Sequence, residues 1–307
     1  MDQAHRLREI VQKRKKDSQG GISSFSDKRE TDIKMAKGSR VIAITSGKGG
    51  VGKTNLVVNL AYSFNKLGRS VCILDADLGL ANIDIILGIT PKFNLKDVIF
   101  DNKSVADIMV KVNDGLSVIP ASSGIQELVD LDNNQRKRLI EQLKMPGKLD
   151  DYFLIDTGAG ISANVLGFVL AAPEAIIVTT PEPTSLTDAY AVIKLISKSN
   201  NRPKIRLLVN MVTDKVEGEG VFKKLNMIVK RFLNVELEYL GYVTLDGNLP
   251  RSVMKQQPIV NLYPRSEASR CFFSIASNLF QEDNINKDCS NSSLAVFWRR
   301  ALSLVKK

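Results

Sequence analysis

The sequence is poor in the residues that build disulfide frameworks and soft-metal sites. Its three cysteines, Cys72, Cys271 and Cys289, stand far apart and form no C-x-x-C pair, so neither a disulfide framework nor a cysteine metal site is indicated. The single histidine, His5, lies in a charged stretch, and we interpret it as a surface residue rather than a catalyst or a ligand. This scarcity fits a reducing cytoplasm.

Long apolar runs are also missing. No run reaches the roughly 18 residues that a membrane-spanning helix needs, and the N-terminus is charged, unlike a signal peptide. The sequence therefore predicts a protein that is neither secreted nor membrane-spanning. With 307 residues, 44% of them apolar, the chain is long enough for one large α/β domain with appendages.

Positive charge is in excess, and it is unevenly placed. The formal net charge is +10, and residues 1–40 hold 11 Lys and Arg against 6 Asp and Glu, so about half of the excess lies there. A basic surface indicates an acidic partner, which could be nucleic acid, anionic lipid or an acidic protein face. Charge alone does not choose among them.

A glycine-rich stretch, Ser-Gly-Lys-Gly-Gly-Val-Gly-Lys-Thr at residues 46–54, matches the phosphate-binding pattern G-x-x-x-x-G-K-[ST]. Its glycines let backbone N–H groups turn toward a phosphate, and the following helix adds the positive end of its dipole. Residues 40–45 predict a buried strand and residues 55–67 an amphipathic helix, which is the context that the motif requires. The predicted nucleotide contacts are Gly47, Lys48, Gly49, Gly50, Val51, Gly52, Lys53, Thr54 and Asn55.

Aspartates follow two further apolar stretches. Residues 70–74 predict a buried strand with Asp75 and Asp77 at its carboxyl end, and residues 152–155 predict another that ends in Asp156. Open parallel sheets place ligands at this edge, and a strand-end aspartate of this kind binds Mg²⁺ through water. For Asp75 and Asp77 a helix-capping pair is the alternative interpretation.

Lys48 directly follows the first glycine, and residues 47–54 resemble the deviant Walker A motif of the MinD/ParA ATPases. The resemblance implies an ATP-dependent dimer in which Lys48 reaches the partner's phosphates, as an arginine finger does. Residues 75–84 resemble the family's switch I, which implies that Asp77 orients the attacking water. With ATP and Mg²⁺ as cofactors, the expected catalytic residues are Lys48, Lys53 and Asp77, and the expected metal site is Thr54, Asp75 and Asp156.

Later strands contribute the dimer face and the adenine site. Residues 175–180 predict a strand followed by Glu182 and Asp188, and the resemblance implies that one of them holds Lys48 when nucleotide is absent. An ordinary charge in the first helical turn is the alternative for Asp188. Residues 205–209 predict a strand that ends in Asn210, which matches the family's adenine-recognising asparagine, and Thr244 lies in the predicted adenine-side loop.

The alternation of strands and helices from residue 40 to about 280 predicts a doubly wound, mostly parallel α/β sheet covered on both faces, the SIMIBI-type P-loop NTPase fold that the resemblance implies. Gly158 and Gly160 permit a switch II loop close to the γ-phosphate, and the family more often has proline where Gly158 stands. The predicted parts are a flexible basic N-terminal extension (1–38), the ATPase domain (39–280), a linker (281–291) and an amphipathic helix (292–307).

The N-terminal extension begins with a short amphipathic pattern that is too short to be a stable helix alone. Residues 2–8 resemble the D-Q-A-x-x-L-R segment of the FlhG branch of the MinD/ParA family, which regulates flagellar number. The resemblance implies that this segment activates an FlhF-like, SRP-type GTPase, and a solvated disordered tail is the alternative. The residues expected to contact the GTPase are Asp2, Gln3, Ala4, Leu7 and Arg8.

The last 16 residues predict a helix with a broad apolar side and a cationic side, which suits the bilayer interface. An ATP-formed dimer presents two copies and gains avidity, so we expect a cytoplasmic protein that joins the membrane when ATP is bound. The alternative is that the apolar side packs on the protein's own core. The predicted membrane residues are Leu294, Phe297, Trp298, Arg299, Arg300, Leu302 and Val305.

These features together predict an ATPase switch that regulates flagellar number or placement through an FlhF-like GTPase, with flagellar basal-body components as further candidate partners. A MinD-type division-site regulator shares the core and the lipid helix. A ParA-like DNA partition protein would use the basic surface on phosphates, but it needs no Phe and Trp stripe, so nucleic acid is not favoured. An iron–sulfur carrier of the Mrp type is disfavoured by the missing C-x-x-C.

Overall fold

The computed structural model describes residues 38–77, 82–101, 103–120, 150–200, 202–285 and 294–304. The strands are β1 (Arg40–Ser46), β2 (Val71–Ala76), β3 (Val110–Asn113), β4 (Leu116–Pro120), β5 (Tyr152–Ala159), β6 (Glu174–Thr179), β7 (Lys204–Val212) and β8 (Glu238–Thr244). The helices are α2 (Lys53–Lys66), α3 (Ile83–Leu87), α4 (Leu95–Phe100), α5 (Val105–Ile108), α7 (Ala163–Ala171), α8 (Pro183–Ser197), α9 (Lys215–Leu233), α10 (Asn248–Met254), α11 (Ile259–Leu262), α12 (Glu267–Ile285) and α13 (Leu294–Leu304).

The strands form one eight-stranded sheet in the order β3-β4-β2-β5-β1-β6-β7-β8. Every pair is parallel except β3 with β4, which confirms the mostly parallel sheet. The antiparallel edge strand β3 was not predicted. It is a four-residue strand that pairs with β4 across the Asp114-Gly115 turn, where Gly115 has a φ of 90°.

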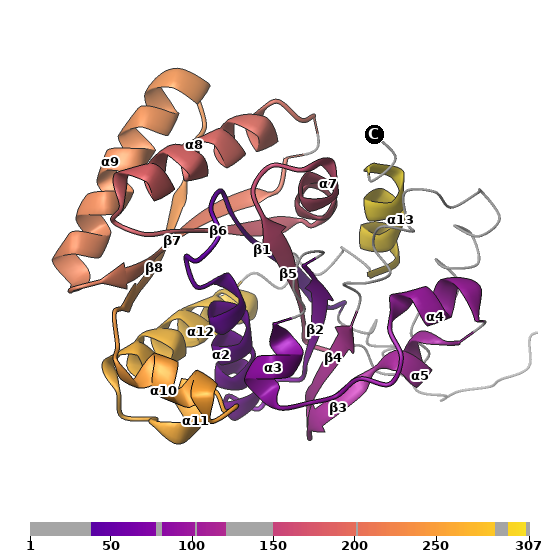
Figure 1. Cartoon of the computed structure of the whole chain (residues 1–307). Helices are drawn as coiled ribbons and strands as arrows, with labels where there is room; N and C mark the ends of the chain where they lie inside the picture. The colour runs from indigo at the N-terminus through magenta and orange to yellow at the C-terminus, as the bar shows by residue number, and fades with distance from the viewer. Residues whose placement is uncertain are drawn as a thin grey trace, which may run out of the picture. The chain divides into compact units, whose positions relative to one another are not determined.

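Helices cover both faces of the sheet (Figure 1), and the side chains of β1 alternate between them. Val41 and Ala43 pack in the core that includes buried residues of α7, α8, α9 and α13. Ile42 and Ile44 pack in the core on the other face, with α2, α3, α11 and α12. Because both faces are covered, each of the central strands β2, β5, β1 and β6 contains an uninterrupted run of four buried apolar residues.

Helix α12 extends beyond its predicted end at residue 280 and continues to Ile285, so residues 281–285 are helical rather than the start of a linker. Two carboxylates in this last turn form ion pairs with arginines of the sheet. Glu282 binds Arg206 of β7 at 2.6 Å, and Asp283 binds Arg40 of β1 at 2.8 Å. Arg206 is only 3% exposed, so this end of α12 is fixed to the starts of both strands.

Helix α13 packs its apolar side against α7 and β5. The buried residues of α13 are those of the predicted apolar side: Leu294, Phe297, Trp298, Ala301 and Leu302. Arg299 and Arg300 are exposed. In this structure the helix therefore has the packing that the sequence left as its alternative, and its membrane role stays a prediction.

Several predicted features lie outside the described residues. They are the N-terminal extension with the residues expected to contact the GTPase, Asp2, Gln3, Ala4, Leu7 and Arg8, and the predicted membrane residue Val305. Among the described helices, none combines the length and the apolar character that crossing a bilayer requires.

Candidate nucleotide site

The glycine-rich loop leads from the end of β1 into α2, as the motif requires. Gly50 and Gly52 have φ values of 81° and 87°, a left-handed conformation that glycine adopts without strain. Gly52 is the N-cap of α2, and no side chain caps the helix there. The first-turn N–H groups of α2 therefore have no side-chain acceptor, and Lys53 lies beside them with 7% of its surface exposed. This is a cradle for an anion.

Gly47 has a different role, because its conformation is not left-handed. A Cβ atom on Gly47 would lie 2.3 Å from the backbone carbonyl carbon of Asp188, so α8 packs directly on the loop. Asp188 itself stands in the second turn of α8 rather than the first, so the interpretation of this residue as a first-turn charge is wrong. The contact couples the phosphate loop to the helix that follows β6.

The predicted metal-site aspartates lie together at the carboxyl edge of the sheet. The register of β2 and β5 places Asp75 opposite Asp156. Burial raises the pKa of Asp156 to about 6, although the charge of Lys53 opposes the shift, and burial together with the charge of Asp156 raises the pKa of Asp75 to about 8. Among the described residues, neither carboxylate oxygen of Asp156 has a hydrogen-bond partner. The hydration shell of Mg²⁺ would satisfy these two oxygens, and Thr54, at the start of α2, would complete the site.

Asp77 lies against Gly158, the second-last residue of β5, next to the loop that follows this strand. A Cβ atom on Gly158 would come within 3.3 Å of Asp77 Oδ1, and the Asp77 N–H donates to Asp75 Oδ1 at 3.4 Å. The loop is tied back to the phosphate loop, because the Gly160 N–H donates to the Ser46 carbonyl at 2.9 Å. The proposed water-orienting carboxylate and the switch II loop are therefore in contact.

Lys48 turns away from its own phosphate cradle. Its Nζ binds Glu182 Oε2 at 2.7 Å and the Thr184 hydroxyl at 3.2 Å. Glu182 is free to do this because it is the N-cap of α8 but makes no side-chain capping bond. Of the two acidic candidates, Glu182 is thus the one that holds the lysine. Thr184 was not predicted, since nothing in its local sequence marks it as a lysine partner.

The predicted adenine residues lie near the carboxyl ends of neighbouring strands, Asn210 two residues before the end of β7 and Thr244 at the end of β8. Asn210 in β7 is 9% exposed, and its Nδ2 donates to the Val51 carbonyl of the phosphate loop at 2.8 Å. Its Oδ1 is then left to accept from a base, which suits the exocyclic amine of adenine and opposes the O6 of guanine. Thr244 of β8 is also 9% exposed, and it lies opposite Val212 of β7.

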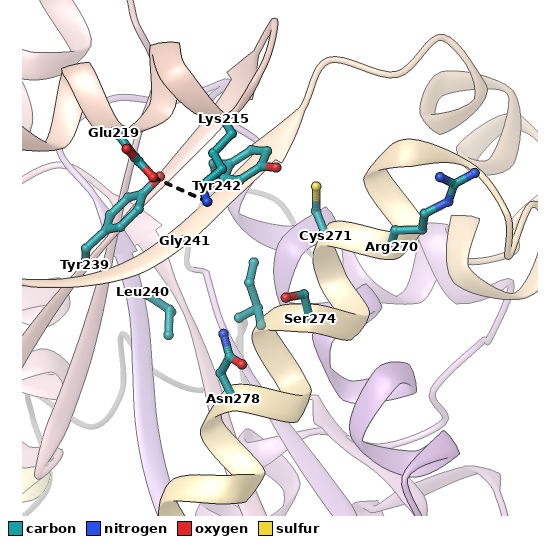
Figure 2. A pocket seen from close by; sticks show the side chains of 11 residues that line it. Lys215, Glu219, Tyr239, Leu240, Gly241, Tyr242, Arg270, Cys271, Ser274 and Asn278 are labelled. Carbon is teal, nitrogen blue, oxygen red and sulfur yellow. Dashed lines mark ion pairs between the residues drawn. The ribbon is translucent and has the colours of Figure 1, made fainter.

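A separate pocket of about 530 Å³ lies along β8, between the first turns of α9 and the middle of α12 (Figure 2). Tyr239 and Tyr242 line it from β8, and Lys215 and Glu219 of α9 form a 3.7 Å ion pair at its rim. None of its lining residues belongs to the predicted nucleotide site. The pocket therefore does not mark the phosphate cradle.

Comparison with known proteins agrees with this geometry. The sequence profile described as the NUBPL iron-transfer P-loop NTPase (ParA) matches residues 37–280. The antiactivator FleN of Pseudomonas aeruginosa is 43% identical over 240 residues, covering 78% of this chain and 86% of FleN. The flagellum site-determining protein YlxH of Helicobacter pylori is 37% identical over 243 residues, covering 78% of this chain and 82% of YlxH.

A solved structure has the same fold. The septum site-determining protein MinD of Pyrococcus horikoshii, complexed with Mg-ADP, superposes with a TM-score of 0.65 and 26% identity, covering 80% of this chain and 98% of that one. Among the described residues, no group of three or more His, Cys, Asp and Glu side chains is arranged to hold a metal ion. The sequence match and the phosphate-loop geometry place the chain in the ParA/MinD family of P-loop NTPases.

Proposed function

We propose that the protein is a Mg²⁺-dependent ATPase that uses ATP to switch between a monomer and a dimer. The observation that carries the proposal is the ion pair between Lys48 and Glu182. Lys53 and Asp156 already supply a phosphate lysine and a metal carboxylate within one subunit, so Lys48 is a spare cation. Because it stands on the exposed side of the loop, with 41% of its side chain exposed, it can serve a neighbouring subunit.

The chain's own residues have defined tasks in this cycle. The N–H groups at the start of α2 and Lys53 bind the β- and γ-phosphates, and Thr54, Asp75 and Asp156 hold hydrated Mg²⁺, which supplies charge neutralisation when bound. Asp77 positions the attacking water. Lys48 leaves Glu182 and contacts the γ-phosphate of the partner subunit, so nucleotide occupancy controls dimerisation.

Light scattering and phosphate release with ATP test this proposal. We expect Lys48→Ala to remain monomeric and to lose hydrolysis, while it still binds nucleotide through Lys53. Lys198→Ala is the matched control, because Lys198 is an exposed lysine at the other end of α8. A Lys48→Ala protein that dimerises and hydrolyses ATP like the control would contradict the proposal.

The membrane step involves α13. In the monomer its apolar side is buried, and release of the helix would expose Phe297, Trp298 and two arginines to an anionic bilayer. Two released helices in a dimer bind more strongly than one. Vesicle co-sedimentation with ATP, ADP and no nucleotide tests the switch, and equal binding in all three states would contradict it.

The biological role that we propose is control of flagellar number or placement, because the similar proteins FleN and YlxH carry flagellar names. An FlhF-like GTPase is the proposed partner of residues 2–11. Deleting these residues should leave ATP binding intact and abolish GTPase stimulation, so a truncated protein that still stimulates would exclude this partner site. Division-site regulation remains the second candidate, since the MinD of Pyrococcus horikoshii has the same fold.

A further inference from the structure

The C-terminal half of α9 carries exposed apolar and basic side chains that no feature of the nucleotide site uses. We name this surface the α9 patch. It comprises Lys223, Lys224, Met227, Ile228, Lys230, Arg231 and Phe232. Residues 220–235 contain no acidic residue, and Lys230 alone of these cations has a described ion pair, with exposed Glu236 at 3.3 Å.

The apolar residues of the patch are not part of the protein core. Helix α9 packs on the sheet through Val221, Leu225 and Val229, which are all buried. Met227 and Phe232, in contrast, are 69% and 65% exposed. At 3.6 residues per turn, Met227 lies among the four cations, while Phe232 lies on another side of the last turn, with its ring centroid 5.4 Å from the Arg231 guanidinium carbon. Large exposed side chains beside cations are typical of a contact with another surface.

The position of the α9 patch in the fold keeps it exposed to solvent both in the monomer and in the proposed ATP dimer. Helix α9 starts after the carboxyl end of β7, near the nucleotide edge, and ends at Leu233, just before β8 begins at Glu238. The patch therefore lies toward the opposite end of the sheet. An ATP dimer that joins two nucleotide edges does not cover it.

The same end of the sheet anchors the linker to α13. Glu282, in the last turn of α12, binds Arg206 at the start of β7, and Arg206 is paired in register with Glu238. The eight residues from 286 to 293 that connect α12 to α13 span roughly 27 Å when extended. A released α13 is thus tethered at the end of the sheet where the α9 patch lies.

We propose that the α9 patch is a second contact with an anionic membrane surface, one that does not depend on nucleotide; it rests on the proposed membrane residence of the protein. Its cations match acidic headgroups, and Met227 and Phe232 match the apolar boundary of the bilayer. The phosphates of duplex DNA would pair with the cations, but DNA would provide no apolar surface for the exposed side chains of Met227 and Phe232. The pocket beside α9 lies at the other half of this helix, near Lys215 and Glu219.

The size of the effect follows from the charges. Each basic residue near an anionic leaflet strengthens binding about fivefold, the equivalent of about 1 kcal/mol. Neutralising two lysines should therefore weaken binding about 25-fold. Because the patch is exposed without ATP, this factor should be the same in ATP and in ADP, whereas the contribution of α13 should appear only with ATP.

The experiment measures vesicle partition coefficients of the full-length protein on phosphatidylglycerol/phosphatidylcholine vesicles in ATP and in ADP. The test variants are Lys223→Gln/Lys224→Gln and Met227→Ser/Phe232→Ser. The control is Lys92→Gln/Lys255→Gln, which removes the same charge from exposed lysines outside α9. We expect both test variants to bind less in both nucleotides, and the lysine pair to lose its effect at high salt, while the control binds like the parent.

Unchanged binding of the two test variants would overturn the inference. It is also wrong if duplex DNA binds the parent more tightly than vesicles do and the lysine variant loses that binding. The proposed ATP switch has a separate readout, the difference between ATP and ADP in the parent protein. If that difference is absent but the ADP-state binding still depends on the patch, the switch fails and the inference on α9 stands.

Discussion

Replacing Phe168 with leucine tests whether the docking of α13 controls membrane binding. Phe168 lies in α7 and is 1% exposed. Its ring centroid is 6.3 Å from that of Phe297 and 6.5 Å from that of Trp298. The substitution keeps a buried apolar side chain in α7 but removes both aromatic contacts with α13.

The expected size comes from those two contacts. An aromatic pair contributes about 0.5–1.5 kcal/mol beyond the area that it buries, so Phe168→Leu should weaken α13 docking by about 1–3 kcal/mol. That corresponds to a shift of roughly 5- to 150-fold in the docking equilibrium. Vesicle binding without ATP should rise toward the ATP-bound level, while binding with ATP should change little, because in the proposed switch ATP itself releases the helix.

The matched control is Phe272→Leu in α12, a phenylalanine of similar burial in the core on the other face of the sheet. Both variants should lower the melting temperature, but only Phe168→Leu should raise ATP-free vesicle binding. The reasoning is refuted if the two variants bind vesicles alike in the absence of ATP. It is also refuted if Phe168→Leu binds more in ATP and ADP by the same factor.

Four further predictions concern the nucleotide site and the sheet. Glu182→Gln should release Lys48 and raise ATP-dependent dimerisation by no more than about fivefold, because an exposed ion pair contributes about 0–1 kcal/mol; analytical ultracentrifugation measures this. Gly47→Ala should abolish ATP binding in a fluorescent-nucleotide assay, since its Cβ meets the α8 backbone at 2.3 Å. The pKa of Asp75 is raised to about 8 in the folded protein, so the nucleotide-free fold holds this proton more tightly than the unfolded chain does. The stability of the nucleotide-free protein should therefore fall as the pH rises toward 8 and Asp75 becomes charged. Thermal stabilisation by Mg-ADP should therefore be larger at pH 8 than at pH 6. Arg206→Met should lower stability by about 1.5–3 kcal/mol in a urea titration, because it removes the two hydrogen bonds that Arg206 donates to Glu282, while Arg40 still pairs with Glu174 and Glu282.

The phosphate cradle and the positions of the main strands along the chain could be predicted because their signals are local. Apolar runs of strand length predicted β1, β2, β5, β6 and β7. In residues 46–54, the spacing of the glycines alone indicates a backbone that can turn around a phosphate. The strand-end aspartates followed from the strands. The edge strand β3 could not be found in the same way, since its Val-Lys-Val-Asn sequence alternates with the period of a strand but is only four residues long, too short to be distinguished from a loop.

Other features depended on contacts between distant residues. The sequence offered Glu182 and Asp188 equally as partners of Lys48, and only the packing of α8 on Gly47 decides between them. The polar stretch at residues 281–285 has the composition of a linker, but arginines from β1 and β7 make it the last turn of α12. An amphipathic period in α13 does not distinguish a bilayer from a protein core, because both accept the same apolar side.

The fold suggests how the nucleotide edge and α13 communicate. Gly158 near the end of β5 contacts Asp77, and Gly160 in the loop after β5 donates a hydrogen bond to the phosphate loop. Helix α7 begins directly after this loop at Ala163. Helix α7 is also the element that packs against α13. Because interiors are densely packed, a shift of this loop toward the γ-phosphate has to move the start of α7 relative to α13. We therefore expect the aromatic contacts of Phe168 to weaken when ATP binds, which makes α7 the physical connection between nucleotide occupancy and release of the C-terminal helix.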